Sequence, residues 1–289
     1  MTPMGLRRAD LGVLLALVVL LAGCAGADAG EDDTSAADGS TCEPGNLPLR
    51  TEGKLTIGTD GRAYEPWFSA DDPSNGRGFE SAVAYAVAKE LGIAAADVTW
   101  VKVPFNSSYL PGEKAFDFDI NQISITDERA RAVDFSEPYY QAAQAVIALK
   151  GSEFDGATSL AELRDARIGA QIGTTSLEAI GQIDPVAAPL VYDDTTLAAE
   201  ALQDGKADAI VADLPSAYHL ASYEIDGARL IGQFQFEPGQ SEQFGLLLQK
   251  GSALTPCVDA AVSALKADGT LARLEQEWLS WAPDVPELR

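Results

Sequence analysis

Apolar residues recur along the chain in short runs that alternate with helical patterns from about residue 53 onward. Leu55–Thr59 and Val98–Val103 have the composition of strands, and Phe79–Leu91 repeats apolar residues with the helical period before Gly92 ends it. Strands that alternate with helices favour an α/β fold with mostly parallel sheets. Further strands are expected at 144–150, 167–172, 205–213 and 246–249, a turn at 134–140, and helices starting near 159 and 175 and spanning 256–265 and 271–281.

One segment carries an arginine where helix physics favours an acid. Residues 116–125 alternate apolar and polar side chains and are predicted to form a strand. Thr126 can cap the following helix, Asp127 and Glu128 suit its first turn, and Arg129 falls where a capping box would place Glu or Gln. Free backbone N–H groups and a guanidinium at one strand end suit a carboxylate. A surface ion pair between Arg129 and a neighbouring acid remains the alternative.

A second α/β unit repeats this arrangement with the opposite charge. The strand predicted at 205–213 ends in Asp213, and Pro215 suits the first turn of the next helix. Ser159 and Thr175 are expected as helix caps, each with a glutamate three residues later. Ligands of open parallel sheets bind at the carboxyl ends of the strands. Arg129 and Asp213 together complement an amino-acid zwitterion, although Asp213 could also serve only as a cap.

The N-terminus has the pattern of an export signal. Arg7 and Arg8 precede an apolar run at 11–21 that is too short to span a bilayer, and Leu-Ala-Gly-Cys24 follows. This ending resembles the bacterial lipobox, so residues 1–23 are expected to be removed and Cys24 to carry a lipid that anchors the protein outside the cytoplasm. An ordinary secretory signal is the alternative. Residues 24–49 are expected to form a flexible tether, since 25–41 hold only small, polar and acidic residues.

The other cysteines agree with export. Cys42 and Cys257 make an even pair in an oxidising compartment, which predicts a disulfide between them. Two free, buried thiols are the alternative.

Charge and composition exclude several functions. A net charge of −24 argues against nucleic acid as a partner. The single histidine, His219, excludes a histidine-rich metal site and is expected to be a surface or packing residue. The chain has no Gly-x-Ser-x-Gly elbow. We therefore expect no cofactor, no metal and no enzymatic activity.

Several short motifs occur in a specific order. They are LTIGTD at 55–60, YEPW at 64–67, GFE at 78–80, VPF at 103–105, SITDER at 124–129, VDFSEPYY at 133–140, GTT at 173–175, AIVAD at 209–213 and LKADGTL at 265–271. With these motifs the chain resembles the extracytoplasmic solute-binding proteins of amino-acid ABC transporters, the polar amino-acid or family 3 class, over about residues 54–281.

The resemblance implies a two-lobed fold of the type II periplasmic-binding-protein kind. Lobe 1 would comprise 50–144 and 244–289 and lobe 2 would comprise 145–243, with hinge strands at 145–149 and 244–248. Each lobe would be a sheet flanked by helices. The lobes of the monomer would close on a free amino acid, polar or charged, and an ABC permease in the membrane would receive it.

The resemblance also implies a role for each site residue. Arg129 would hold the α-carboxylate, helped by Ser124, Thr174 and Thr175. Asp213 would accept the α-ammonium, together with a carbonyl near Gln122 and the Ser124 hydroxyl. Tyr64 and Phe105 would pack on the solute side chain, and Asp60 and Trp67 would line the pocket, although these aromatics could also be core residues.

Two questions stay open at this level. Asp60 suits a basic side chain, whereas Gln122 suits an amide or an acid, so the preferred amino acid is undecided. A related dehydratase acting on a prephenate-like acid, or a sensor that presents its closed form to a membrane receptor, are the alternatives to transport.

Overall fold

The computed structural model describes residues 42–236, 240–280 and 285–289 of the 289-residue chain. The expected export signal, Cys24 and the tether up to residue 41 lie outside the described residues. The described residues belong to one compact unit. Within them, no helix is long and apolar enough to cross a membrane.

One mixed sheet is built from the first four strands and the last one, in the order β2-β1-β3-β10-β4. β1 pairs in parallel with β2 and β3, whereas β10 runs antiparallel to β3 and β4. Its strands are β1 (Leu55–Thr59), β2 (Val98–Lys102), β3 (Phe118–Asp119), β4 (Val133–Ala142) and β10 (Glu242–Gln249).

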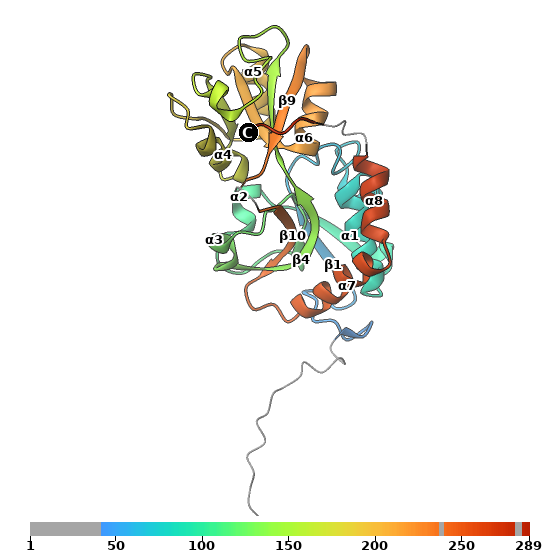
Figure 1. Cartoon of the computed structure of the whole chain (residues 1–289). Coiled ribbons are helices and arrows are strands. Elements are labelled where there is room, and N and C mark those ends of the chain that lie inside the picture. The colour runs from blue at the N-terminus through green and yellow to red at the C-terminus, as the bar shows by residue number, and fades with distance from the viewer. Residues whose placement is uncertain (1–41, 237–239, 281–284) are drawn as a thin grey trace, which may run out of the picture. The chain divides into compact units, whose positions relative to one another are not determined.

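Three long helices share an apolar core with this first sheet. They are α1 (Phe79–Glu90), α7 (Thr255–Ala267) and α8 (Thr270–Leu279), which lie together beside it (Figure 1). Leu55 and Ile57 of β1 belong to the same buried cluster as Val83 of α1, Val258 of α7 and Leu271 of α8. Burial of these side chains is the main stabilising term for the sheet.

The second mixed sheet has the order β7-β6-β8-β5-β9. Val146 and Ala148 of β5 belong to one buried cluster, and Ala145 and Ile147 belong to another, so both faces of the strand are covered. Burial on both faces accounts for the continuous apolar run in this strand. Its strands are β5 (Gln144–Leu149), β6 (Ile168–Gln171), β7 (Leu190–Tyr192), β8 (Ala209–Asp213) and β9 (Ala228–Phe234).

Shorter helices complete the described unit. The α-helices are α2 (Phe105–Ser108), α3 (Asp127–Ala130), α4 (Thr175–Ala179), α5 (Thr195–Gln203) and α6 (Leu214–His219). Single turns of 3₁₀ or π helix are η2 (Pro73–Asn75), η3 (Ala95–Asp97), η4 (Leu160–Leu163), η5 (Ile180–Ile183) and η6 (Leu220–Glu224). The predicted α/β class is confirmed. The sheets are mixed rather than mostly parallel as expected, because each has two parallel and two antiparallel pairings.

Several local predictions are wrong. The strand expected at 116–125 shrinks to the two residues of β3, because Gln122 adopts a left-handed φ of 48° that turns the chain. Residues 134–140 belong to β4 and are not a turn; the pairing with β10 shifts register at Gly245, opposite Pro138. Ser159 makes no side-chain cap, since the Glu162 carboxylate accepts instead from the N–H and hydroxyl of Thr158.

The disulfide prediction is confirmed. Cys42 is bonded to Cys257 of α7, across 215 positions of sequence. The C-terminal residues differ from expectation, because 285–289 pack on the second sheet. Leu288 joins one of its buried clusters and donates its backbone N–H to the carbonyl of Gln233 in β9, whose own N–H donates to the Pro286 carbonyl.

Candidate functional site

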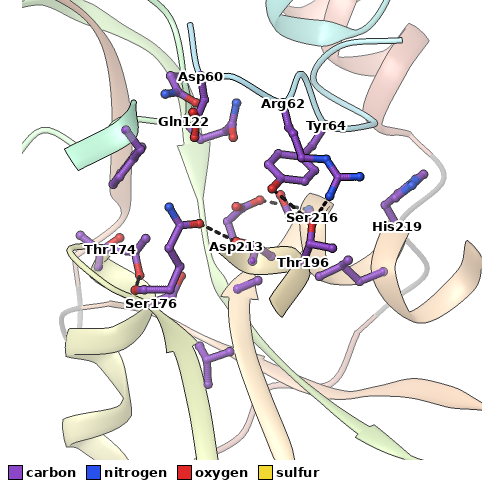
Figure 2. Close-up of a pocket in the computed structure, with 18 of the residues that line it drawn as sticks. Asp60, Arg62, Tyr64, Gln122, Thr174, Ser176, Thr196, Asp213, Ser216 and His219 are labelled. Atoms are coloured by element: carbon purple, nitrogen blue, oxygen red, sulfur yellow. Dashed lines mark hydrogen bonds between the residues drawn. The ribbon is translucent and has the colours of Figure 1, made fainter. Parts of the chain in front are cut away.

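A cavity is lined by residues at the ends of strands and in the adjoining loops of both sheets (Figure 2). Asp60 follows β1, Gln171 ends β6 and Asp213 ends β8, so three strand ends converge on it. The described lining consists of Asp60, Arg62, Tyr64, Glu65, Phe105, Asn121, Gln122, Gln144, Gln171, Thr174, Thr175, Ser176, Thr195, Thr196, Val211, Ala212, Asp213, Ser216, His219, Leu220, Glu224 and Phe244.

Seven of the ten side chains that the sequence predicts to touch a ligand line this cavity: Asp60, Tyr64, Phe105, Gln122, Thr174, Thr175 and Asp213. Arg129, Ser124 and Trp67 do not. Trp67 is fully buried in the first sheet's core, where it packs on Phe79 and Phe244.

Asp213 is both a helix cap and a cavity residue. Its Oδ1 accepts from the backbone N–H of Ser216 at 3.1 Å, at the start of α6. Burial raises the pKa of Asp213 to about 6, and the nearby Glu242 carboxylate adds to the rise. A cation bound beside Asp213 would relieve this penalty.

Arg129 is buried without a carboxylate partner among the described residues. It is 7% exposed; Nη1 donates to the Ser124 carbonyl at 2.8 Å and Nη2 donates to the Gly173 carbonyl at 2.9 Å. Its guanidinium carbon lies 4.8 Å from the ring centre of Tyr109 and 5.6 Å from that of Phe105. The surface ion pair considered from the sequence is therefore wrong, whereas the Thr126 cap is confirmed by its bond to the Arg129 N–H.

A buried carboxylate that sequence reasoning missed holds Ser124 and Thr175. Oε1 of Glu242 accepts from the Ser124 hydroxyl at 2.5 Å and from the Thr175 hydroxyl at 2.6 Å. The cap of α4 is Thr174, whose hydroxyl accepts from the Leu177 N–H, so the prediction of Thr175 as cap is wrong by one residue. The Thr175 hydroxyl is directed to Glu242 instead.

Gln122 lines the cavity but its amide is engaged behind it. Its backbone N–H donates to Glu80 at 2.7 Å, and its Nε2 and the Tyr139 hydroxyl also donate to that carboxylate. Glu80 is fully buried, and burial raises its pKa to about 7. These bonds fix Gln122 in its left-handed conformation.

Side chains on opposite sides of the cavity bond to each other. Nη1 of Arg62 donates to the Thr196 hydroxyl at 2.8 Å, and the Tyr64 hydroxyl lies 3.3 Å from the same oxygen (Figure 2). The Trp67 Nε1–H donates to the Ser216 hydroxyl at 2.8 Å. The cavity is therefore bridged by direct hydrogen bonds between loops of the two sheets.

Acids dominate the charged groups of the lining. Asp60, Glu65, Asp213 and Glu224 face a single Lys or Arg side chain, Arg62, among the described residues. Burial raises the pKa of Asp60, and the Asp194 carboxylate contributes. A cationic solute would be favoured here over an anionic one. The described residues contain no His, Cys, Asp and Glu cluster able to hold a metal ion.

Sequence comparison then decides the family. The model of the bacterial extracellular solute-binding proteins, family 3, matches residues 55–280. The chain belongs to this family.

Relatives of this solute-binding protein bind amino acids, as their names state. The L-cystine-binding protein TcyJ of Escherichia coli (strain K12) is 30% identical over 234 residues, covering 80% of this chain and 84% of the relative. The glutamine-binding protein GlnH of an ABC transporter of Bacillus subtilis (strain 168) is 27% identical, covering 94% and 96%. An ancestral arginine-binding protein, solved with arginine bound, superposes with a TM-score of 0.67 at 29% identity, covering 79% of this chain and 99% of the other.

Several lining residues of this solute-binding protein have no local sequence signal. Gln144 begins an apolar strand, and Thr196, Ser216 and His219 lie near the starts or ends of helices. From the sequence alone such positions are predicted to be helix caps or surface residues, and only the folded second sheet shows that they line a cavity. His219, expected on the surface or in packing, lines the cavity with Nε2 3.3 Å from Glu224.

Proposed function

We propose that this protein binds a free amino acid with a positively charged side chain and delivers it to an ABC importer. One observation carries the proposal: a cavity lined from both sheets, in which the acidic and basic side chains of the described lining are four carboxylates and one arginine. The relatives are binding proteins by name, which favours binding and transport over the dehydratase alternative.

Asp213 would pair with the α-ammonium. It is a buried carboxyl whose pKa is raised to about 6, so it gains from a cationic partner. Arg129 would pair with the α-carboxylate, because among the described residues its buried guanidinium bonds to carbonyl oxygens and has no carboxylate counter-ion. To reach a solute in the cavity, the guanidinium must exchange the Ser124 or Gly173 carbonyl for the solute carboxylate.

Asp60 would pair with a basic side chain. Gln122 is the other residue that could contact the solute side chain. It already donates its amide N–H to Glu80, which leaves it poorly placed to bind an amide or an acid. Asp60 has acceptor capacity beyond its bonds to the Gly61 and Phe105 N–H groups. Tyr64 and Phe105 line the same cavity and would cover the aliphatic stem.

Closure would be driven by contacts from both lobes. We place lobe 1 at 50–144 and 244–280, lobe 2 at 145–243 together with 285–289, which pack on the second sheet, and the hinge strands at 145–149 and 244–248. A solute held by Asp60 on one lobe and Asp213 on the other would stabilise the closed form in proportion to its extra contacts there. The protein would act as a monomer, anchored at the outer face of the membrane by a lipid on Cys24.

A thermal-shift screen of the common L-amino acids, followed by calorimetry, tests the proposal. A ligand at 100 times its dissociation constant should stabilise the protein by about 2.7 kcal/mol. We expect arginine, lysine or ornithine to bind more tightly than glutamine, cystine or glutamate. Preference for an acidic or neutral amino acid would refute the charge assignment, and turnover of prephenate or arogenate would refute binding as the function.

A further inference from the structure

The side chain of Gln144 carries a buried oxygen without a partner. Gln144 is the first residue of β5, is 1% exposed and lines the cavity. Its Oε1 has no hydrogen-bond partner among the described residues. Because buried polar atoms are nearly always paired in folded proteins, an orphan acceptor at a cavity wall indicates a donor supplied from the cavity.

Glu242 determines which way this amide points. Nε2 of Gln144 donates to Oε2 of Glu242 at 2.6 Å. An ionised carboxylate only accepts hydrogen bonds, so the amide must present its nitrogen to Glu242 and its oxygen elsewhere. Glu242 is itself 5% exposed and is held by the hydroxyls of Ser124 and Thr175. The amide therefore has one favourable orientation.

The orphan oxygen lies beside Asp213. Gln144 and Asp213 are direct partners in the antiparallel pairing of β5 with β8, and side chains of such partners project from the same face of a sheet. Both side chains line the cavity. The Thr175 hydroxyl proton is committed to Glu242, so toward the cavity this hydroxyl can only accept. Gln144, Asp213 and Thr175 thus present three acceptors, one of them charged, to the same cavity.

Three acceptors match a group with three N–H donors, which is a protonated primary amine. We propose that Oε1 of Gln144 accepts a hydrogen bond from the solute's α-ammonium beside Asp213, and that Glu242 is the positioning residue that orients the amide. This assignment rests on the proposed function, because it requires a solute with an amino group. A solute with a hydroxyl or hydrogen in place of the amine would leave Gln144 unpaired.

Calorimetry with two ligands tests the role of Gln144. L-Arginine carries the α-amino group, and 5-guanidinopentanoate is arginine without it. Gln144→Met keeps the side-chain volume and removes the acceptor, so arginine should bind about 10-fold or more weakly, the loss expected for a hydrogen bond to a charged group. 5-Guanidinopentanoate should lose less than about 2-fold. Gln233→Met, in the neighbouring β9 and outside the lining, is the matched control and should change neither affinity.

Each result is decisive. Equal losses for both ligands, or no loss for either, would overturn the role of Gln144. Failure of the wild type to bind arginine would overturn the proposed function first, and it is seen before any variant is made. Thermal unfolding of each ligand-free variant checks that the fold is retained.

Glu242→Gln tests the positioning role. The neutral amide no longer forces one orientation on Gln144, so arginine should bind several-fold more weakly. 5-Guanidinopentanoate reports any loss that arises through Ser124 and Thr175, which Glu242 also holds, and its loss should be smaller than that of arginine. In the Gln144→Met background the same substitution should cost arginine no more than it costs 5-guanidinopentanoate, because Glu242 then has no amide to orient and only its bonds to Ser124 and Thr175 remain. Additive losses in the double variant would show that Glu242 acts independently and would overturn this part.

Discussion

The indole N–H of Trp67 donates to the hydroxyl of Ser216 at 2.8 Å, which joins the aromatic core beneath the first sheet to helix α6 of the second. A fully buried core residue therefore helps to hold the two sides of the cavity together. The same serine donates its backbone N–H to Asp213, so one helical turn links the core of one sheet to the charged wall of the cavity.

Trp67→Phe should weaken solute binding about 5-fold. It removes the hydrogen bond to Ser216, worth about 1 kcal/mol, which forms only when the two sides of the cavity are together. Calorimetry with the preferred amino acid measures this. Trp100→Phe is the control, since the Trp100 N–H bonds to Tyr85 within the first-sheet region. Similar losses in both variants would argue for a general packing effect.

Arg129→Ala should reduce affinity for an amino acid by more than about 30-fold, since loss of one partner of a buried charge pair costs about 2–5 kcal/mol. Titration of the preferred amino acid measures the loss. Arg131→Ala, an exposed arginine two residues on, should bind as the wild type does. Unchanged affinity in Arg129→Ala would exclude it as the carboxylate-binding group.

Solute affinity should fall as pH drops through about 6. The pKa of Asp213 is about 6 without a cation, and only the ionised form attracts the ammonium, so affinity should be constant well above pH 6 and decline below it. Asp213→Asn keeps a residue able to cap α6 but should bind weakly, with little pH dependence from pH 5 to 8. A wild-type affinity that is flat over this range would contradict the role of Asp213.

The stability of the fold should decrease as pH rises from about 4.5 to about 7, because Glu80 holds a proton in the folded state over this range. The folded pKa of about 7 lies above the ordinary 4.5, so the folded state binds the extra proton and the free energy of unfolding falls between these values, by about 3 kcal/mol at most. Urea unfolding at pH 5 and pH 8 measures it. Glu80→Gln should lose most of this difference; a difference that persists unchanged would assign it to other groups.

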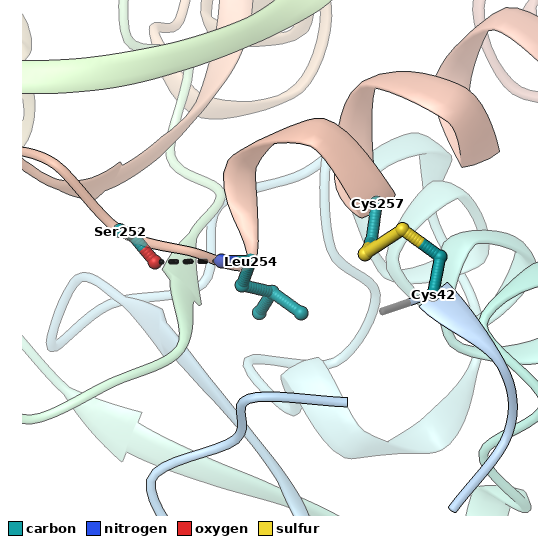
Figure 3. Close-up of a disulfide and its surroundings, with 4 residues drawn as sticks. All are labelled: Cys42, Ser252, Leu254 and Cys257. Carbon is teal, nitrogen blue, oxygen red and sulfur yellow. Dashed lines mark hydrogen bonds between the residues drawn. A yellow bond between two sulfur atoms is a disulfide. The ribbon is translucent and has the colours of Figure 1, made fainter. Parts of the chain in front are cut away.

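Removing the disulfide should cost stability and leave binding intact. Neither Cys42 nor Cys257 is among the described residues that line the cavity. Their bond joins the start of the described chain to helix α7 (Figure 3). The Cys42→Ser, Cys257→Ser double variant should lose about 2–4 kcal/mol of unfolding free energy. Denaturant unfolding with and without reductant measures this, and reductant should shift only the wild type. A large change in solute affinity would show that the bridge also shapes the cavity.

Local chemistry predicted part of this molecule well. The Thr126 cap, the Pro215 turn and the start of β1 depend on neighbouring residues, so the sequence carries their signal. The strand predicted at 116–125 was wrong because this segment is buried on both sides, and alternation of apolar and polar residues does not reveal that Gln122 turns the chain. The Glu242 and Gln144 bond joins residues 98 positions apart, which no local pattern reveals.

Only Ala143 separates β4 from β5. Any rotation of one sheet against the other must be absorbed by the backbone torsions of the few residues around it, because the strands on either side are held in their ladders. Gln144 stands at this pivot with its side chain in the cavity. A solute bound to Gln144 would then contact the protein at its hinge. A small change in backbone torsion there produces the largest displacement in the residues farthest from the hinge.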